Sequence, residues 1–387
     1  MKLEQLTMKN ISTKLFSNIY NIMYLLSRIR KNVWVLSGKE KNTGEKLDII
    51  IAGSVLTKNY ISRLFLRELT DERRIGKRAF WNILGEAGSG ASGPSMLVME
   101  IEREFSRYVD SKGAFLIPCW VTGEIDLSSN LTKVIKKNHG LKKNTKRILE
   151  NGLYFEIKHD LKDFDNFYHN MYLPYVNKKY EEEAIVWTYE KMKREFKKCI
   201  LLLIKKEDQE IAGNLINIRE KQPRMWVMGI KDGNYEYIKE GAIHALYYYS
   251  FEYFLKNGAK RVNIGYTRGF LEDGVLQYKR QWGLKISGIS KNYFYLRPLQ
   301  KTPGLQAIFS YNPFIFECGG KLKDAIFESI EEIKEDEALH RYKGRYLIPG
   351  IDEVCLFDYN NQQGKTKEWQ REDLTFSIHN MDEIFPS

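Results

Sequence analysis

CILLLIKKEDQEIAGNLINIREKQPRMWVMGIK (199–231) opens the part of the chain that decides the fold, which runs from Cys199 to Leu296. Its continuous apolar runs, separated by EDQ and KQP, predict three strands in succession. YIKEGAIHALYYYSFEYFLKNG (237–258) predicts a long helix with Gly258 at its end. KRVNIGY (260–266) then predicts a strand, LEDGVLQYKRQWG (271–283) a short helix, and LKISGISKNYFYL (284–296) a final long strand.

The segments before this stretch predict further strands and helices. We expect strands in 46–55 and 153–157, a pair of strands in 114–127, and helices in 59–69, 95–109 and the second part of 131–152, where Gly152 stops the helix. After Pro298 we expect a helix at 321–340 and a strand at 353–359. No period of 20 to 50 residues repeats, which excludes a solenoid.

A chain of 387 residues predicts two packed domains or one duplicated fold. The expected division is an N-terminal helical extension (1–45), a first half (46–198), a second half (199–298) and a C-terminal extension (299–387). In the N-terminal extension, apolar residues recur at helical spacing from Ile11 to Ile29. This helix either packs on the body or lies against a membrane surface.

Composition limits the class of protein. No apolar run approaches the ~20 residues that span a bilayer, and MKLEQLTMKN lacks the features of a signal peptide. The four cysteines are scattered singly and no H-E-x-x-H occurs, so no metal site is expected. A cytoplasmic location follows as an expectation, with the inner face of the membrane as an alternative.

Charge is distributed unevenly over the chain. The net charge of +11 divides into −6 for residues 321–387 and +17 for the rest. The basic part predicts an anionic partner or substrate, although a lysine-rich chain can also be basic without such a partner. Within it, a segment without acids carries seven cations: Lys133, Lys136, Lys137, Lys142, Lys143, Lys146 and Arg147.

The order of elements resembles the core of the GNAT acyltransferases. EIAGNLINIRE (210–220) resembles the strand with "hydrophobic-Ala-Gly", and VNIGYTRGFLEDGVLQYKRQWG (262–283) resembles the closing motif of the Fem-type, double-GNAT transferases. In that motif "aromatic-Lys-x-x-aromatic-Gly" is read here as Tyr278-Lys279-Arg280-Gln281-Trp282-Gly283. The resemblance covers about residues 120–298. It implies an α/β (α+β) fold of two tandem GNAT-like halves, with mixed, mostly antiparallel sheets flanked by helices.

The same resemblance implies N-acyl transfer from an activated donor to an amine. The donor is acyl-CoA or aminoacyl-tRNA, used as a co-substrate, and no permanently bound cofactor is expected. Of the glycine pattern that holds CoA pyrophosphate in GNAT enzymes, only Gly241 remains in Glu236–Ala242, which favours aminoacyl-tRNA. The acceptor is an envelope precursor, a nucleotide-linked sugar or a peptide.

The resemblance places the expected catalytic residues on the closing motif. Lys279 is expected near the reacting carbonyl or substrate phosphates, Asp273 as a base and Tyr278 beside them. The residues alone leave other roles open. Lys279 can be a solvated lysine, Asp273 a helix cap, and Tyr266 and Tyr278 aromatic residues of the core. His244 is expected to be a partly buried histidine with its hydrogen bonds satisfied. The residues expected to bind substrate are Arg268, Tyr266, Trp282, Gly88, Gly90, Lys142, Lys143 and Arg147.

Two of these groups predict anion binding. Gly88-Ser89-Gly90-Ala91-Ser92-Gly93 spells G-x-G-x-x-G without a convincing strand before it, so a phosphate loop and a surface linker remain alternatives. Lys142, Lys143 and Arg147 predict contact with an RNA backbone or a solvated helix face. The second hypothesis for the whole chain is a non-catalytic module that binds RNA or another anion on a GNAT-like fold.

Overall fold

The computed structural model describes most of the chain from residue 29 to residue 384. The described ranges are 29–86, 93–109, 113–128, 131–180, 186–219, 222–329, 346–358, 367–371 and 374–384, with residues 337, 340 and 342. They form two compact units. Unit 1 takes its residues from Met1–Leu116, Tyr293–Tyr311 and Met381–Ser387, and unit 2 from Ile117–Asn292 and Asn312–Asn380.

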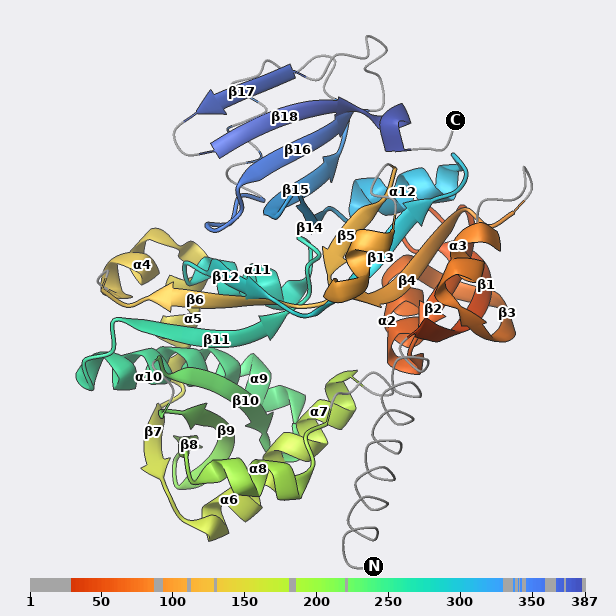
Figure 1. Ribbon diagram of the computed structural model, residues 1–387. Helices are drawn as coiled ribbons and strands as arrows, with labels where there is room; N and C mark the ends of the chain where they lie inside the picture. Colours follow the sequence, from red (N-terminus) through yellow and green to blue (C-terminus); the bar gives the residue numbers. More distant parts are fainter. Residues whose placement is uncertain are drawn as a thin grey trace, which may run out of the picture. The chain divides into compact units, whose positions relative to one another are not determined.

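Unit 1 is built on five strands in the order β13-β4-β2-β1-β3. β1 pairs antiparallel with β2 and β3, and β2 pairs parallel with β4 (Figure 1). The strands are β1 (Arg30–Glu40), β2 (Lys46–Gly53), β3 (Leu66–Ala79), β4 (Met96–Glu102) and β13 (Asn292–Pro298). The helices are α2 (Val55–Phe65), α3 (Phe80–Glu86), α12 (Pro303–Tyr311) and the short 3-10 helices η1 (Arg103–Tyr108) and η5 (Met381–Ile384).

Two predictions for this region differ from the structure. Arg30–Glu40, expected within the helical extension, is a strand with another strand on each side. Met96–Glu102, expected to start a helix, is a strand whose first four residues are all buried. A continuous apolar run suits a parallel strand that is covered on both faces, and periodicity alone does not separate it from a buried helix. Residues 1–28, with most of the predicted first helix, lie outside the described residues.

Unit 2 contains a seven-stranded sheet in the order β12-β6-β11-β10-β9-β8-β7. Neighbouring strands in it are antiparallel, except that β10 and β11 run parallel. The strands are β6 (Val121–Asp126), β7 (Leu153–Lys158), β8 (Cys199–Lys206), β9 (Gln209–Asn217), β10 (Arg224–Ile230), β11 (Arg261–Thr267) and β12 (Lys285–Ile289). The order of elements predicted for 199–296 is confirmed with two differences. The single long helix predicted at 237–258 is two helices, α9 (Tyr235–Lys239) and α10 (Ala242–Lys256), and the last long strand is two strands, β12 and β13.

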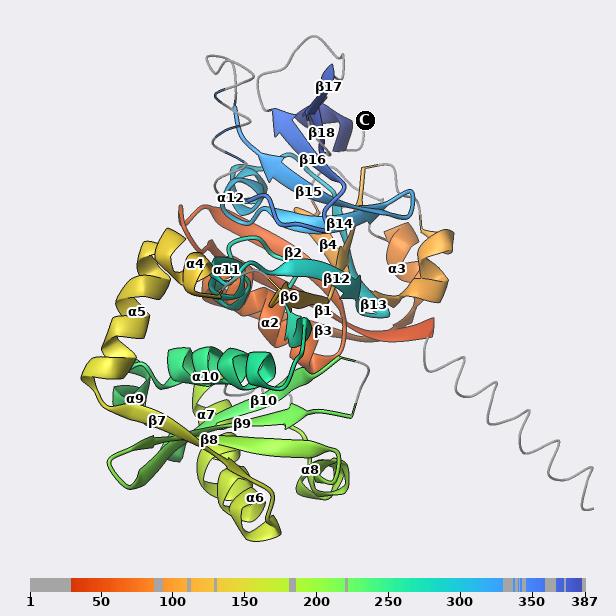
Figure 2. The same ribbon diagram turned by 90° about the vertical axis from the view of Figure 1, so that its left-hand side faces the viewer.

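Helices cover both faces of this sheet. Gly213 of β9 packs on the Phe167 ring, whereas the next residue, Asn214, donates a 3.0 Å hydrogen bond to Ser250 of α10. Because neighbouring strand residues point to opposite faces, α10 and α6 lie on opposite sides of the sheet (Figure 2). The helices are α4 (Leu131–Lys137), α5 (His139–Glu150), α6 (Leu161–Phe167), α7 (Leu173–Tyr180), α8 (Tyr189–Phe196), α9 (Tyr235–Lys239), α10 (Ala242–Lys256), α11 (Gly274–Gln281), the π-helix η2 (Tyr168–Tyr172) and the 3-10 helix η4 (Lys231–Gly233).

A second group of strands in unit 2 has the order β14-β15-β16-β18-β17. They are β14 (Phe314–Cys318), β15 (Lys321–Phe327), β16 (Glu353–Asp358), β17 (Lys367–Arg371) and β18 (Leu374–Asn380). The predicted strand at 353–359 is confirmed as β16. The helix predicted from residue 321 is not observed, because Lys321–Phe327 is a strand that pairs with β14 and β16.

The units do not follow the predicted boundaries. β7 pairs with β8 along its whole length, so the sheet runs across the expected division between residues 198 and 199. The chain also passes from unit 2 to unit 1 between Asn292 and Tyr293, and from unit 1 to unit 2 inside β5 (Phe115–Pro118). The predicted fold class, a mixed α/β fold with mixed sheets flanked by helices, is confirmed. Among the described helices, none is long and apolar enough to cross a bilayer.

Candidate functional site

The site predicted from the sequence lies in unit 2, where β10 and β11 run parallel. The two strands are in register at a single pair, Arg224 with Asn263. Each strand is also irregular there, because the β10–β9 pairing shifts after Met225 and the β11–β6 pairing shifts after Asn263. Gly265 adopts a φ of 73°, and its N–H donates to Asn263 Oδ1 at 2.8 Å. The backbone of β11 is therefore bent just before it reaches Tyr266.

Lys279 of α11 points its ammonium group at this bend. Its side chain is buried, and Nζ donates a 2.9 Å hydrogen bond to the Tyr266 carbonyl oxygen. Burial lowers the pKa of Lys279 to about 7; nearby Asp273 opposes this shift and Lys179 of α7 adds to it. The ammonium has three donor hydrogens and the carbonyl takes one. Near neutral pH this group can act as a cation or as a proton acceptor.

Asp273 joins β11 to α11. Its Oδ1 accepts hydrogen bonds from the backbone N–H groups of Val275 and Leu276, at 3.0 and 2.9 Å, and from Thr267 Oγ1 at 3.0 Å. The residue is therefore the N-cap of α11, one of the two roles that its sequence context predicts. The cap fixes the start of the helix that carries Lys279.

Tyr278 lies on a different face of α11 from Lys279 because consecutive helical residues are about 100° apart. Its hydroxyl is 2.9 Å from His244 Nδ1, and His244 Nε2 is 3.1 Å from Thr145 Oγ1. The Thr145 hydroxyl donates to the Leu141 carbonyl, so it must accept from the histidine. The chain of donors then runs from Tyr278 through His244 to Thr145, joining α11, α10 and α5.

This polar chain is enclosed by aromatic rings. Trp282 stacks on His244 with ring centroids 4.8 Å apart and is itself buried. Burial lowers the pKa of His244 to about 4, with Arg147 adding to the shift, and burial raises the pKa of Tyr278. His244 is thus neutral at ordinary pH, and the prediction that its hydrogen bonds are satisfied is confirmed; its side chain is more fully buried than predicted. Tyr278 and Trp282 hold α11 against α10 on this face.

The other predicted substrate residues on this loop are placed differently. Tyr266 has 55% of its surface exposed. The Arg268 guanidinium lies 3.7 Å from the centroid of the Trp120 ring and donates to the Cys119 carbonyl at 3.2 Å. The structure therefore brings Tyr266, Asp273 and Lys279 together, while Arg268 is held against the residues that precede β6.

The start of α10 has no phosphate loop of the usual kind. Short helix α9 precedes it, and Gly241 between them has a φ of 105°. Glu240 pairs with Lys206 at 2.7 Å, and its carbonyl accepts from Asn151. The aliphatic part of Arg147 packs 3.7 Å from where a side chain on Gly241 would begin. A carboxylate close to the helix N-terminus disfavours a pyrophosphate there.

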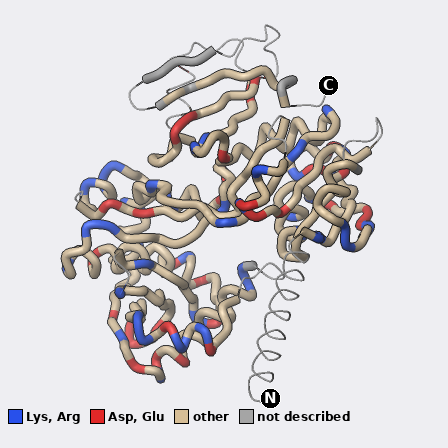
Figure 3. The backbone as a smooth tube through the Cα atoms, in the orientation of Figure 1, with Lys and Arg blue, Asp and Glu red and all other residues tan. Residues whose placement is uncertain are grey.

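The basic segment forms α4 and α5. Lys142 and Lys143 are exposed, Arg147 is half-buried, and the lysines of α4 are exposed. Figure 3 marks the positions of lysine and arginine along the backbone in blue. Lys146 pairs with Glu150 at 3.3 Å. The exposed lysines can reach a solvated polyanion. Gly88 and Gly90, the predicted phosphate loop, lie outside the described residues.

Sequence reasoning missed a polar hollow in unit 2. Its volume is about 430 Å³, and it shares no residue with the predicted site. Its lining carries three carboxylates and one cation: Asn166, Asn170, Met171, Asp208, Gln209, Glu210, Lys231 and Asp232. The residues come from three separate parts of the chain, so no local motif marks them.

Comparisons with known proteins gave matches only among solved structures. No family model and no curated protein matches the chain. L-PGS from Bacillus licheniformis matches with 14% identity and a TM-score of 0.34, over 71% of this chain and 87% of that one. FemX matches with 11% identity and a TM-score of 0.36, over 67% and 83% of the two chains. A tandem GNAT protein from the clavulanic acid pathway matches with 9% identity and a TM-score of 0.30, over 68% and 82%.

Proposed function

We propose that this chain is an N-acyltransferase, which moves an acyl or aminoacyl group from an activated donor to an amine. The observation that supports this most is the buried Lys279, whose ammonium sits on the Tyr266 carbonyl at the bend of β11. An amine that attacks an ester or thioester carbonyl creates an oxyanion and releases a proton. A preorganised cation in a dry site stabilises such an oxyanion far more than a solvated lysine would.

In the proposed reaction the acceptor nitrogen bonds to the donor carbonyl carbon. The bond from that carbon to the ester oxygen or thioester sulfur then breaks. The leaving hydroxyl or thiol gains a proton, and the attacking amine loses one. Lys279 donates to the oxyanion with hydrogens not used by Tyr266, while Asp273 keeps α11 in place through its cap.

For the donor we propose aminoacyl-tRNA. Glu240 close to the N-terminus of α10 opposes a pyrophosphate, and the exposed lysines of α4 and α5 suit a long polyanion. The acceptor class is an envelope precursor, a nucleotide-linked sugar or a peptide, reached in the cytoplasm or at the inner face of the membrane. Native mass spectrometry of the purified protein with CoA and with charged tRNA tests the donor. Tight binding of CoA without tRNA would overturn this choice.

The reaction is tested by Lys279→Ala and Lys279→Met, with transfer and donor binding measured separately. We expect single-turnover transfer to fall by roughly 10²-fold or more, the usual loss for one oxyanion donor. Donor binding should change little. Lys285→Ala is the matched control, since Lys285 is an exposed lysine of the same unit. Circular dichroism confirms folding, and unchanged transfer in a folded variant would remove Lys279 from the mechanism.

The second candidate is a non-catalytic module that binds RNA or another anion. It is favoured by the same exposed lysines and by the cap and core roles of Asp273 and Tyr278. No transfer with any donor, together with intact RNA binding, would select it. Transfer that depends on Lys279 would exclude it.

A further inference from the structure

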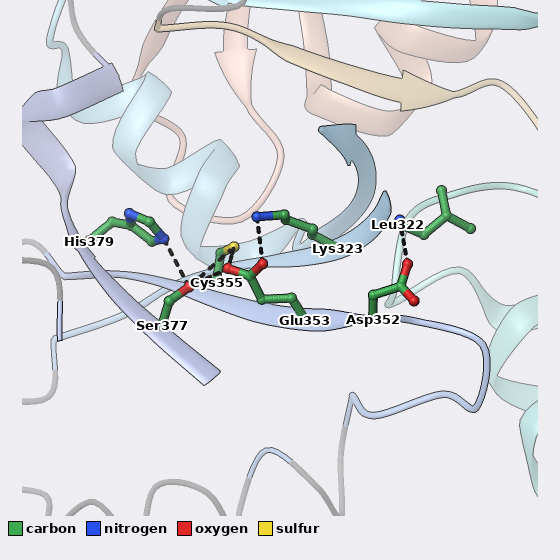
Figure 4. A network of polar contacts seen from close by, with 7 residues as sticks. All are labelled: Leu322, Lys323, Asp352, Glu353, Cys355, Ser377 and His379. Atoms are coloured by element: carbon green, nitrogen blue, oxygen red, sulfur yellow. Dashed lines mark hydrogen bonds and ion pairs between the residues drawn. The ribbon is translucent and has the colours of Figure 1, made fainter. Parts of the chain in front are cut away.

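Five polar side chains gather on one face of the strands β15, β16 and β18, outside the proposed transfer site. Cys355 pairs with Ser377, and Glu353 and His379 each lie two residues along, so all four point to the same face. Lys323 pairs with Glu353 from β15 on the other side. Figure 4 shows these side chains converging from the three strands.

The Ser377 hydroxyl is the hub of this cluster. It is 2.7 Å from Glu353 Oε1, 3.5 Å from Cys355 Sγ and 2.9 Å from His379 Nε2. A single fully buried hydroxyl thus contacts three atoms of different chemistry. Cys355 Sγ also lies 3.3 Å from Glu353 Oε1. The three atoms around the hydroxyl are a carboxylate oxygen, a thiol sulfur and an imidazole nitrogen, which together form a ligand set typical of Zn²⁺.

The ligand atoms are already close to the spacing that a metal needs. All three lie within 4.8 Å of one another, and ligands around tetrahedral Zn²⁺ are about 3.5 Å apart. Small rotations of the side chains close that difference. Lys323 Nζ is 2.5 Å from Glu353 Oε2, the carboxylate oxygen that faces away from the hub. The lysine therefore orients the carboxylate and leaves Oε1 for a metal, as outer contacts of metal ligands do.

We propose that Glu353, Cys355 and His379 bind a divalent cation of the Zn²⁺ type, with the Ser377 hydroxyl turning aside to admit it. The thiol of Cys355 loses its proton to solvent when the metal–sulfur bond forms, and His379 binds as neutral imidazole. Water takes the fourth position. Sequence reasoning could not find this site, because its ligands are on strands separated by a long connection and follow no recognised spacing.

A nucleophilic thiol is the other interpretation of a cysteine close to a histidine. The Cys355 side chain is buried. Reactive cysteines have the opposite setting, because they are accessible to solvent. The burial therefore favours a ligand over a nucleophile. His379 also stacks on Phe357, with centroids 5.1 Å apart, which restrains its ring as a ligand.

Cobalt spectroscopy tests the proposal on the whole chain. Co²⁺ added to the metal-free protein should give a thiolate-to-metal charge-transfer band and the visible bands of tetrahedral coordination, and Zn²⁺ should abolish both. Cys355→Ser should lose the charge-transfer band. Cys318→Ser, which changes the exposed cysteine of the same unit, should keep it. The proposal would be overturned if the wild type showed no charge-transfer band. It would also be overturned if Cys318→Ser lost the band while Cys355→Ser kept it.

Ser377→Ala separates a metal site from a purely hydrogen-bonded cluster. The variant removes the hydroxyl that competes for the three ligand atoms, so Co²⁺ should bind more tightly by about fivefold, the equivalent of one hydrogen bond. Its metal-free form should be less stable to heating than the wild type. A variant that binds Co²⁺ no better than the wild type, or not at all, contradicts the displacement. The charge-transfer band of the wild type tests the metal site by itself. The proposal can therefore still be contradicted if the variant misfolds.

Discussion

Lys279 is a basic group held where water has little access, and this has a consequence for stability. Its pKa is lowered to about 7 in the folded protein, against 10.5 for an unperturbed lysine. Between these two values the unfolded chain binds a proton that the folded chain has released. Stability therefore rises with pH across this window and is insensitive to Lys279 below it.

We expect the free energy of unfolding to rise from pH 7 to pH 9 by about 2 kcal/mol more in the wild type than in Lys279→Met, since each pKa unit corresponds to about 1.4 kcal/mol. Urea titrations at pH 6, 7, 8 and 9 measure the difference. Lys285→Met, at an exposed position, should follow the wild type. Parallel curves for the wild type and Lys279→Met would show that the lysine is not protected from water.

Two glycines, one in a strand and one in a helix, differ in the space that surrounds them. A side chain on Gly229 of β10 would meet the backbone of Met171 and Tyr172, with atoms at 2.5 to 2.8 Å. Gly274, the first residue of α11, has open space around the same position. Gly229 lets η2 lie directly on β10, whereas no neighbouring element packs closely at Gly274.

Gly229→Ala should therefore destabilise the protein by about 1–3 kcal/mol, because backbone atoms cannot move aside cheaply. Gly274→Ala should be neutral or stabilise it by up to about 1 kcal/mol through a less flexible unfolded chain. Chemical unfolding of the two variants and the wild type compares them. Equal stabilities for both variants would mean that η2 does not rest on β10 as described.

Elements of the second half could be predicted because their strands are continuous apolar runs and their helix ends at a glycine. Met96–Glu102 and Lys321–Phe327 were predicted wrongly. The first is held as a strand by β2, a partner distant in sequence. The second pairs with the distant β16 but also with β14, which directly precedes it across Gly319-Gly320, so a local hairpin signal was overlooked there. Lys279 is predicted as a site residue from a motif. The contact of Tyr278 with His244 depends on how α11 lies on α10 and could not be predicted from either segment.

Over the whole molecule, charge is concentrated in the part of the chain before residue 321, which carries +17 of net charge. If tRNA binds there, affinity must fall as salt rises, because each neutralised phosphate releases counterions. The exposed Lys142 and Lys143 of α5 are the residues to vary.

Lys142→Ala/Lys143→Ala should weaken tRNA binding at low salt and reduce the slope of log affinity against log salt by about 2, since each phosphate that is no longer neutralised lowers it by about 1. Filter binding at several salt concentrations measures this slope. Lys256→Ala/Lys260→Ala removes two exposed lysines of the same unit as a control and should leave the slope unchanged. If both pairs lower it equally, α5 has no special part in binding.

The segments of unit 1 lie far apart along the chain, and this constrains the order in which the protein can be made. Met381 and Ile384 of η5 are buried, and the Ile384 carbonyl lies 3.0 Å from where a side chain on Gly113 would begin. β13 and α12 of the same unit arrive only after the whole seven-stranded sheet has been translated. During synthesis on the ribosome, all strands of the seven-stranded sheet are therefore available before β13, α12 and η5 of unit 1 have been made. Until then the apolar faces of β2 and β4 lack these partners, and we expect chaperones to bind them.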